Sequence, residues 1–424
     1  MVNDHYDYLL LGAGMASDAA ARGIREVDPT GSIGIVGREQ TEPVTRPALS
    51  KKLWTDPDFT FDQVWTGTAE DTGADLLLGE TVVALDTDRR TVSTASGREI
   101  GYGKALVATS GTPGSADVDD SHGTGRVIPF RSVRDYERLR GLTSHGSPHV
   151  VVVGGSYIAT ELAAGLTETD AQVTLVFTQD TLLDQMLPAD LAGRVELPFR
   201  THGVELVRGT GATGGEVRGP DGPVHLALSS GEQVEADVVV LGLGISLETG
   251  FAAEAGLETV DDGGIVVDEH LRSSDPAVWA AGDVAHYPDR VLGARRVEHV
   301  DHATSSGRAA GRDMAGADEP YAHTPFYYSV LFGVRYEAVG TLDASLEIVE
   351  DRQGPADDPL AQVVAYYVEP ADDGTDAVRV HGVLLWGVDE GTEAPDAARE
   401  VLAAGPTDPA SLRGRIVLGE LGEA

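Results

Sequence analysis

Three observations predict an α/β fold for this chain of 424 residues. A short apolar strand at 8–11 leads into a glycine turn and an alanine-rich helix, the same order returns at 148–161, and later apolar runs also end in glycine turns. Strands that alternate with helices form parallel sheets with helices on their faces. A glycine turn between such a strand and helix is typical of nucleotide-binding βαβ motifs. We therefore expect two Rossmann-like domains, and the length leaves room for a third domain.

The first glycine turn has the spacing G-x-G-x-x-S, in which Gly12 allows the turn and Gly14 lets the backbone approach a pyrophosphate. The small Ser17 replaces the third glycine, where helix and strand pack closely, and the helix N-terminus would face the phosphates. Glu39, beyond the second strand, is the candidate acceptor for ribose hydroxyls. The expected nucleotide-binding residues of this motif are Gly12, Gly14, Met15, Ala16, Ser17 and Glu39. Because the motif alone is weak, a glycine turn in an unrelated α/β protein is the alternative.

The second glycine turn departs further from the nucleotide-binding pattern. It reads G-G-S-Y-I-A, with Ser156 and Ala159 where glycines are expected. Phe177 stands where an acidic residue would hold the 2′-hydroxyl of NAD, and neither Thr178 nor Gln179 is an arginine that could hold a 2′-phosphate. The sequence therefore does not choose between NAD and NADP. The candidate residues of this turn are Gly154, Gly155, Ser156, Tyr157 and Ile158.

Two such motifs about 140 residues apart favour two different nucleotides, a flavin and a nicotinamide. Two further apolar runs end in turns, and their candidate residues are Thr109, Ser110, Gly111, Gly242 and Gly244. The run 276–281 leads to Gly282-Asp283, where a carboxylate can accept hydrogen bonds from flavin ribitol hydroxyls, and we expect a helix N-terminus to follow it. Taken alone, Gly282-Asp283 also fits an Asx turn or a helix cap.

The chain is strongly acidic, with 31 Lys+Arg against 69 Asp+Glu and a net charge of −38. This charge argues against a nucleic-acid-binding surface, which needs clustered Lys and Arg. Only three residues are lysine, namely Lys51, Lys52 and Lys104. The acidic, lysine-poor composition favours a salt-adapted, halophilic protein, and an ordinary acidic cytosolic protein is the alternative.

The chain contains no cysteine, which excludes disulfides, thiolate metal sites and a cysteine nucleophile. The N-terminus lacks the basic segment of a signal peptide, and no apolar run approaches the length of a membrane helix. We therefore expect a cytoplasmic protein.

Longer segments resemble the apoptosis-inducing-factor-like family of two-dinucleotide-domain flavoprotein reductases, which also includes ferredoxin-reductase-like enzymes. Residues 42–54, with the core Arg-Pro-Ala-Leu-Ser-Lys-Lys-Leu-Trp, are similar to a motif of that family, with Ala48 in place of a proline. Residues 295–308 match closely, and 336–340 and 383–386 extend the resemblance toward the C-terminus. These matches are more specific than either glycine motif.

The resemblance implies the domain organisation. An FAD-binding domain would be split over 1–125 and 250–315, with an NAD(P)H-binding domain at 126–249 inserted into it. A C-terminal α+β domain would occupy 316–424 and form an antiparallel sheet. Two acidic stretches in it, 350–359 and 369–374, are expected to be solvated loops.

The resemblance also implies a catalytic environment. Lys51 matches the lysine and Glu161 the glutamate that form an ion pair beside flavin N5, where the cation stabilises the reduced ring and the carboxylate keeps the lysine charged. Further positions carried over as FAD contacts are Arg46, Val82, Thr109, Ser110, Gly111, Arg131, Glu298 and His299. Without the resemblance, Lys51 and Glu161 would be read as solvated surface charges and His299 as a helix cap. We expect no metal at His299-x-x-His302, because the matching family segment is not a metal site.

The expected function is that of an FAD-dependent NAD(P)H oxidoreductase, in which hydride passes from nicotinamide C4 to flavin N5. Without a cysteine relay, electrons would leave from the flavin edge to a ferredoxin-type protein, a quinone, oxygen or a dye. A second copy of the chain is a further partner left open.

Two alternatives remain at this stage. One is a redox-responsive regulatory flavoprotein with slow NADH oxidation, in which Tyr327-Tyr328-Ser329 and the acidic loops would serve partners. The other is a flavoprotein reduced by another donor, if Ser156, Ala159 and Phe177 have abolished nicotinamide binding.

Overall fold

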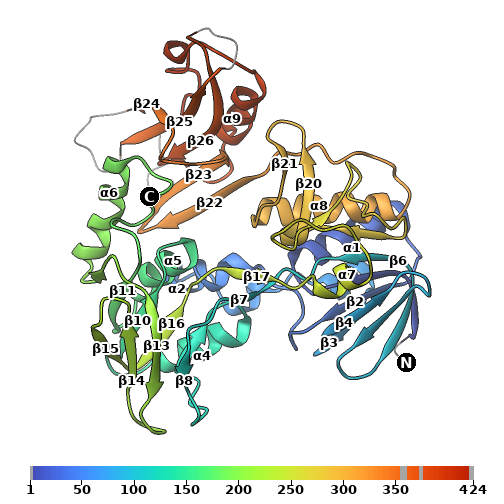
Figure 1. Cartoon of the computed structure of the whole chain (residues 1–424), viewed down its shortest axis with the longest axis horizontal. Helices are drawn as coiled ribbons and strands as arrows, with labels where there is room; N and C mark the ends of the chain where they lie inside the picture. The colour runs from blue at the N-terminus through green and yellow to red at the C-terminus, as the bar shows by residue number, and fades with distance from the viewer. Residues whose placement is uncertain (1–2, 354–360, 372–375, 420–424) are drawn as a thin grey trace. The chain divides into compact units, whose positions relative to one another are not determined.

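The computed structural model describes residues 3–353, 361–371 and 376–419 (Figure 1). The chain forms two compact units. Compact unit 1 consists of Met1–Pro47, Thr60–Thr112 and Ile245–Pro325, and compact unit 2 of Ala48–Phe59, Pro113–Gly244 and Phe326–Ala424. The division into FAD, NAD(P)H and C-terminal domains stays a prediction.

Compact unit 1 is built on a mainly parallel sheet of order β3-β2-β1-β6-β5-β4, to which β19 adds by pairing with β6. The strands pair in parallel except at the β6-β5-β4 edge, where they are antiparallel. Residues Leu9, Leu10 and Leu11 are fully buried, because helices and loops cover both faces of a parallel sheet. The strands are β1 (His5–Leu11), β2 (Ile33–Gly37), β3 (Asp75–Leu78), β4 (Val82–Asp86), β5 (Thr91–Thr94), β6 (Glu99–Val107) and β19 (Val278–Ala280).

Helices α1 (Met15–Val27) and α8 (Val300–Met314) lie side by side against this sheet (Figure 1). Small residues allow the close approach, since a Cβ on Gly307 or Gly311 would overlap the carbonyl oxygens of Ala16 or Ala20. The remaining elements are η1 (Arg46–Leu49) and β7 (Gly111–Pro113), which both run into compact unit 2, and η2 (Phe61–Val64), α3 (Thr68–Thr72), β17 (Ile245–Leu247), α7 (Gly250–Glu254), β18 (Ile265–Val266), η3 (Gly282–Val284), β20 (Ala285–Asp289) and β21 (Gly293–Arg295).

Compact unit 2 contains a second parallel sheet, of order β12-β11-β10-β16-β9. A smaller sheet, β15-β14-β13-β8, accompanies it. The elements of this part are α2 (Lys52–Thr55), β8 (Val118–Asp119), β9 (Val127–Pro129), α4 (Val133–Thr143), β10 (His149–Val153), α5 (Tyr157–Leu166), β11 (Gln172–Val176), α6 (Ala189–Thr201), β12 (Glu205–Val207), β13 (Ala212–Val217), β14 (Val224–Leu228), β15 (Gln233–Ala236) and β16 (Val238–Leu241).

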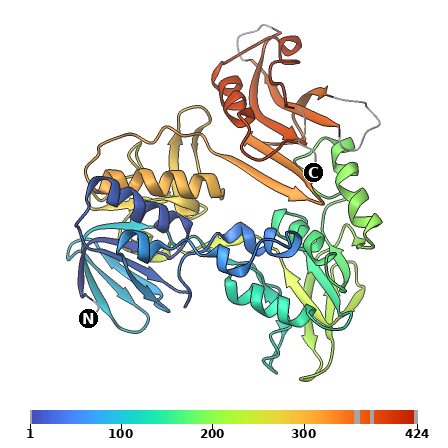
Figure 2. The ribbon, with the colours of Figure 1, turned by 180° about the vertical axis from the view of Figure 1, so that it is seen from behind.

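The C-terminal part of compact unit 2 is an antiparallel sheet of order β22-β23-β26-β25-β24. Helix α9 (Ala394–Ala403) packs against β23 and β26 (Figure 2). The strands are β22 (Phe326–Leu331), β23 (Val334–Gly340), β24 (Glu347–Gln353), β25 (Gln362–Pro370) and β26 (Val378–Trp386), and η4 (Pro409–Ser411) follows α9.

The predicted fold class is confirmed: the chain contains two Rossmann-like sheets and a C-terminal antiparallel sheet. Two local expectations were wrong. The residues after Asp283 form only the short 3-10 helix η3 and then β20, whose residues alternate between buried and more exposed positions as in a strand. Residues 350–353 and 369–370 belong to β24 and β25 rather than to loops, and an edge strand such as β24 tolerates charged residues.

Within those two predicted loops, residues 354–359 and 372–374 lie outside the described residues. Among the residues that are described, no helix has the length and apolar character needed to cross a bilayer.

Candidate functional site

The first glycine turn, in compact unit 1, is shaped to admit a phosphate group. Gly12 has φ +115°, its N–H donates to the Val36 carbonyl at 2.7 Å, and a Cβ there would overlap the Ala108 carbonyl. A Cβ on Gly14 would meet nothing within 4 Å, and no side chain caps the N-terminus of α1 at that residue. The N-terminus of α1 is therefore left without a side-chain cap, which suits the pyrophosphate of a dinucleotide.

The Gly282-Asp283 turn lies beside this glycine turn. A Cβ on Gly282, which has φ +68°, would stand 3.2 Å from the Ala16 methyl. The Ser110 hydroxyl donates to Asp283 Oδ2, so the loops after β6 and β19 meet at this carboxylate. Arg296 donates through Nη1 to the Asp283 carbonyl at 3.1 Å and to Glu298 Oε1 at 2.8 Å. The sequence-predicted residues Ser110, Asp283 and Glu298 are thus brought together.

The other predicted residues of compact unit 1 have more varied surroundings. Glu39 and Arg46, to which the sequence gives separate contacts, form an ion pair at 2.8 Å. Thr109 donates to the Glu248 carbonyl at 2.7 Å, and Gly111 packs so closely on Ser246 that a Cβ would overlap its carbonyl. Val82 packs against the hydrophobic core, and Met15 and the buried Ser17 belong to α1. Burial lowers the pKa of His299 to about 4, so its ring is neutral at pH 7.

Lys51 and Glu161 meet in compact unit 2, with Lys51 Nζ 2.8 Å from Glu161 Oε1. The second turn of α5 carries Glu161, whose side chain is only 1% exposed. Two hydroxyls also bind this carboxylate: Ser50 donates to Oε2 at 2.7 Å and Ser329 donates to Oε1 at 2.6 Å. Three donors thus satisfy this buried carboxylate. The alternative of a solvated surface charge is therefore wrong for Glu161.

The segment that carries Lys51 is fastened to α5 and α4 by Trp54. The Trp54 indole donates to the Leu49 carbonyl at 2.7 Å, and Gly165 of α5 leaves room for its Cβ. The indole packs edge-on against Tyr136 at 5.4 Å, with the Arg140 guanidinium 5.0 Å above it. Lys51 is thereby placed between Glu161 and the Tyr328 ring, whose centroid is 5.3 Å from Nζ.

Sequence reasoning missed Ser50 and Ser329 as partners of this pair. Ser50 lies inside the family-like motif at 42–54, which signals its importance without stating a contact. Ser329 was noted only as part of a partner-binding segment, and its 168-residue separation from Glu161 gives no sequence signal. Tyr328, in the same segment, was not connected with this pair either; Lys51 Nζ and the Arg335 guanidinium lie 5.3 and 4.1 Å from its ring centroid.

The second glycine turn keeps the backbone geometry of the first despite its altered sequence. Gly154 has φ +134°, and its N–H donates to the Val176 carbonyl at 2.8 Å. Ala159 occupies the position of the third glycine, and Gly242 accommodates it, because a Cβ on Gly242 would stand 3.0 Å from the Ala159 methyl. No side-chain bond from Ser156 caps the N-terminus of α5. This arrangement leaves the N-terminus of α5 without a side-chain cap, as a phosphate-binding turn requires.

The remaining predicted residues near this turn lie in different settings. The Tyr157 hydroxyl donates to Met186 Sδ at 3.0 Å, and burial raises its pKa well above the usual value. Ile158 is exposed, and a Cβ on Gly155 would overlap the Gln179 side chain. Gly244 has φ +78° and open space around it. Arg131 also lies in compact unit 2, where its backbone N–H donates to Asp135 Oδ2 at 3.1 Å, so its contact with FAD stays a prediction.

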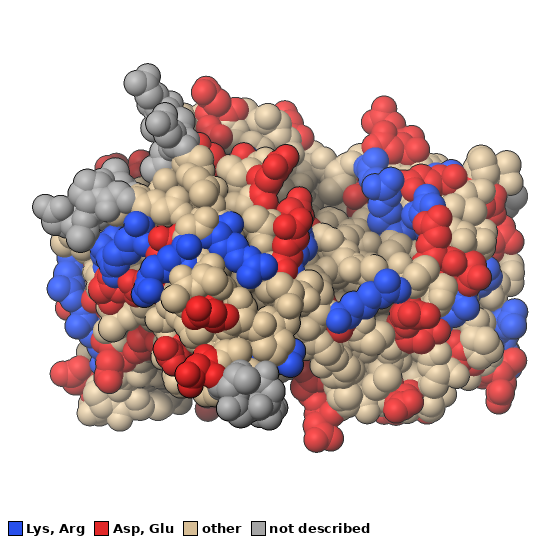
Figure 3. All heavy atoms as spheres, turned by 90° about the horizontal axis from the view of Figure 1, so that it is seen from above, with Lys and Arg blue, Asp and Glu red and all other residues tan. Residues whose placement is uncertain are grey.

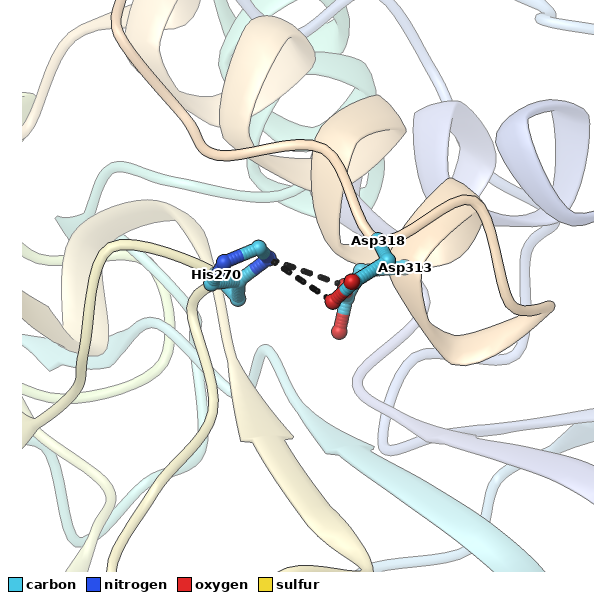
Figure 4. Close-up of side chains that lie close together, drawn as sticks. All are labelled: His270, Asp313 and Asp318. Carbon is cyan, nitrogen blue, oxygen red and sulfur yellow. Dashed lines mark hydrogen bonds and ion pairs between the residues drawn. The ribbon is translucent and has the colours of Figure 1, made fainter.

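One group of described residues has the donor atoms of a metal site, namely His270, Asp313 and Asp318 (Figure 4). Arg272 holds both oxygens of Asp313 at 2.7 and 2.8 Å and Asp318 Oδ1 at 3.1 Å. The Trp279 indole also donates to Asp313, at 2.8 Å. A guanidinium already neutralises these carboxylates, so we assign this group a structural role.

His302 is a core residue rather than a ligand. It is fully buried, stacks on Tyr287 with ring centroids 4.4 Å apart, and shares a hydrogen bond of 3.0 Å with the Tyr321 hydroxyl. Burial lowers its pKa to about 3.

The chain is similar to proteins of known families. The sequence model of the family described as pyridine nucleotide-disulphide oxidoreductase matches residues 6–307. The 5,5′-dehydrodivanillate O-demethylase ferredoxin reductase subunit of Sphingobium sp. (strain NBRC 103272 / SYK-6) is 31% identical over 363 residues, covering 84% of this chain and 86% of that protein. Mitochondrial apoptosis-inducing factor 1 of Dictyostelium discoideum is 29% identical over 415 residues, covering 91% and 76%.

A solved structure, the covalent putidaredoxin reductase–putidaredoxin complex, matches with a TM-score of 0.82 and 26% identity over 97% of this chain and 96% of that chain. The chain spans about half the length, 51%, of another relative, from Drosophila melanogaster. The family match covers most of the chain, and the Sphingobium relative is matched over nearly its whole length. The chain is therefore an NAD(P)H-dependent flavoprotein oxidoreductase and belongs to the pyridine nucleotide-disulphide oxidoreductase family.

Proposed function

We propose that this protein is an FAD-dependent NAD(P)H oxidoreductase that passes electrons directly to a ferredoxin-type protein. The buried Lys51–Glu161 pair carries this proposal, because a cation fixed by a charged carboxylate is suited to stabilise a reduced flavin. We assign Lys51 to the vicinity of flavin N5 on the strength of the family resemblance.

The residues of compact unit 1 fit FAD. Gly12, Gly14 and the N-terminus of α1 would hold the pyrophosphate, and Asp283, supported by Ser110, would accept hydrogen bonds from the ribitol hydroxyls. Bound FAD would supply a ring that accepts a hydride and releases electrons singly. We propose FAD and NAD(P)H as the two nucleotides.

The composition supports direct electron transfer to the acceptor. With no cysteine in the chain, no disulfide or thiol relay can receive electrons from the flavin. The Sphingobium relative is named a ferredoxin reductase subunit, and the putidaredoxin reductase structure was solved as a complex with putidaredoxin. An iron–sulfur protein of this type is the acceptor that we propose.

The net charge of −38 sets the conditions of that encounter. Acidic ferredoxins would be repelled at low ionic strength, whereas the Debye length falls from about 10 Å at 0.1 M salt to about 3 Å at 1 M. We propose that the protein is salt-adapted and meets its acceptor in a salty cytoplasm. A rate that is highest at low salt would contradict this electrostatic argument.

Two measurements test the function. Anaerobic titration of the purified holoprotein with NADH and with NADPH should bleach the flavin absorbance with at least one of them. Reduction of an acidic [2Fe–2S] ferredoxin, followed by its visible absorbance, should then accelerate as salt increases from about 0.1 to about 1 M. Absence of bleaching with both nucleotides would overturn the proposal.

The similarity to apoptosis-inducing factor favours a second candidate, a redox-responsive regulatory flavoprotein. Such a protein would show NADH-driven dimerisation and a persistent charge-transfer band without turnover. Sedimentation with and without NADH, beside the ferredoxin assay, separates the two candidates.

A further inference from the structure

The two glycine-turn motifs of this chain share one hydrogen-bond pattern, so their residues can be matched position by position. In each motif the first glycine donates to a residue near the end of the second strand, and two residues that follow the third strand donate to backbone carbonyls just beyond that residue. The matched bonds are Gly12 to Val36 (2.7 Å) and Gly154 to Val176 (2.8 Å), Gly79 to Glu39 (3.0 Å) and Gly209 to Gln179 (3.2 Å), and Glu80 to Gly37 (2.9 Å) and Thr210 to Phe177 (3.1 Å).

This match shows which side chains differ at the place where a nucleotide-binding motif meets the adenosine ribose. That place is the carboxyl end of the second strand. Glu39 of the first motif corresponds to Gln179 of the second, so a carboxylate is replaced by a neutral amide. Leu78, which precedes Gly79, corresponds to Arg208, which precedes Gly209. Relative to the first motif, these two positions gain two units of positive charge.

Arg208 is held in place by a buried carboxylate. Its Nη2 lies 2.5 Å from Oε2 of Glu196, which also binds Arg200 Nη2 at 2.8 Å. Glu196 Oε1 accepts the backbone N–H of Leu182 at 3.1 Å, which ties the carboxylate to the loop after β11. Two guanidinium groups share one carboxylate, and the Arg208 side chain remains 37% exposed. A positioned, accessible guanidinium with spare N–H donors is suited to a phosphate.

Gln179 lies over the glycine turn itself. A Cβ on Gly155 would overlap its amide oxygen, and the Thr178 hydroxyl donates to that oxygen at 3.4 Å. Phe177, which corresponds to Gly37 of the first motif, is buried. The side chains at the end of β11 therefore include no carboxylate at the position of Glu39.

Two other charges belong to the comparison. Arg38 of the first motif corresponds to Thr178, but its guanidinium is directed to Thr112 at 3.0 Å and Glu248 at 3.6 Å. Asp180 of the second motif corresponds to Gln40 and is exposed one residue beyond Gln179. Asp180 is thus the acidic side chain that competes with our assignment, and the experiment must include it.

We propose that Arg208, together with the amide of Gln179, binds the 2′-phosphate of NADPH, which makes NADPH rather than NADH the electron donor. This inference rests on the proposed function, because it names the nucleotide that reduces the flavin. A 2′-phosphate carries close to two negative charges at neutral pH, which a carboxylate at position 179 would repel.

Binding of fragments tests the site without the redox reaction. Calorimetry on the holoprotein should show that 2′,5′-ADP binds more tightly than 5′-AMP. Arg208→Ala should weaken the binding of 2′,5′-ADP by roughly 10- to 100-fold and leave the affinity for 5′-AMP nearly unchanged, as expected for a lost charge-assisted hydrogen bond. Arg208→Lys should retain part of the affinity that Arg208→Ala loses. Gln179→Glu should weaken the binding of 2′,5′-ADP but not that of 5′-AMP.

Matched controls separate recognition from structure. Arg200→Ala removes the other guanidinium from Glu196. If Arg208 had only a structural role, Arg208→Ala and Arg200→Ala would each weaken the binding of 2′,5′-ADP and of 5′-AMP to the same extent. Asp180→Asn should strengthen the binding of 2′,5′-ADP. If it instead weakens the binding of 5′-AMP and NADH, Asp180 is the ribose acceptor and our assignment is overturned. Equal affinity of the wild type for both fragments also overturns it. Flavin reduction by NADH alone would contradict this inference and leave the proposed function intact, whereas reduction by neither nucleotide would contradict the function.

Discussion

The residue that organises the candidate catalytic site is Glu161. Its buried carboxylate accepts hydrogen bonds from Ser50 and Ser329 and pairs with Lys51, so segments far apart in the sequence converge on one charged group. An ionised carboxylate is stable in the interior only when its charge and lone pairs are satisfied. The same contacts that stabilise the fold therefore fix the position of the lysine.

Replacing Lys51 should separate flavin reduction from flavin binding. Lys51→Ala removes the cation of the buried pair but leaves the glycine turn of compact unit 1 unchanged, so we expect FAD to be retained and the rate of flavin reduction to fall at least about tenfold, equivalent to about 1.4 kcal/mol of activation free energy. Stopped-flow absorbance with excess nicotinamide nucleotide measures the rate. Lys52→Ala is the matched control, because Lys52 is 54% exposed and lies 3.7 Å from Glu390. Equal rates in the two variants would remove Lys51 from the catalytic residues.

The sequence could predict the members of this pair only through the family resemblance, and it could not predict their surroundings. The spacing between Lys51 and Glu161 carries no periodic signal, and Ser329 comes from an antiparallel strand that the sequence does not align with α5. The glycine turns, in contrast, are local motifs whose backbone requirements are readable directly: both Gly12 and Gly154 have a positive φ. Long-range convergence thus needs the structure, whereas local turns do not.

His302 should make the protein sensitive to acid. Its pKa is lowered by burial to about 3 in the folded state, so below the ordinary value of about 6.5 the unfolded chain binds a proton that the folded chain does not. The contribution of His302 to the stability of the folded state is therefore fully present above pH 6.5 and is lost as the pH falls toward 3. Within that window we expect the free energy of unfolding to fall by about 1.4 kcal/mol for each unit of pH decrease because of this residue.

Urea unfolding at a series of pH values measures this slope. His302→Gln should flatten it, and His145→Gln, at an exposed position, should not. The groups that influence His302 are His299, Asp301 and His323, so the comparison of slopes is more informative than the absolute value. An unchanged slope in His302→Gln would show that another group governs acid unfolding.

At the scale of elements, the packing of α1 against α8 positions the first glycine turn. Small residues at the contact let the two helices approach until glycines of α8 touch backbone oxygens of α1. The alanine-rich composition of α1 predicts a sheet-facing helix, but it does not reveal that α8, almost 300 residues later, is its partner. Similarly, the helix expected after Asp283 is replaced by β20, because burial alternates along 285–289.

Adding a methyl group at this contact should separate the helices. Gly311→Ala places a Cβ against the Ala20 carbonyl, so we expect the free energy of unfolding to fall by about 1–3 kcal/mol through overpacking. Because α1 carries the N–H groups that face the phosphates, FAD retention should fall as well. Gly193→Ala is the matched control, since a Cβ there meets nothing and alanine favours a helix by up to about 1 kcal/mol. Denaturant unfolding and flavin absorbance after gel filtration test both; equal stability of the two variants would refute the packing argument.

At the scale of the whole molecule, the acidic residues behind the net charge of −38 are distributed along the sequence rather than confined to one segment. On the face shown in Figure 3, Asp and Glu side chains are scattered, and Lys and Arg side chains gather in a few groups among them. Many basic groups are already used in ion pairs, as Arg272 is with Asp313 and Arg312 with Glu26. The excess carboxylates therefore repel one another across the surface, and this repulsion opposes the compact state.

Salt should consequently stabilise the protein. Raising the ionic strength from about 0.1 to about 1 M shortens the Debye length from about 10 to about 3 Å, which screens repulsion between exposed carboxylates more than it weakens buried pairs such as Lys51–Glu161. The thermal midpoint of the holoprotein should therefore rise with KCl over this range. Calorimetry in KCl, compared with sorbitol of matched osmolality, separates screening from the general effect of an excluded solute. If sorbitol raises the midpoint as far as KCl does, charge repulsion does not limit stability, and the acidic surface then needs an explanation other than salt adaptation.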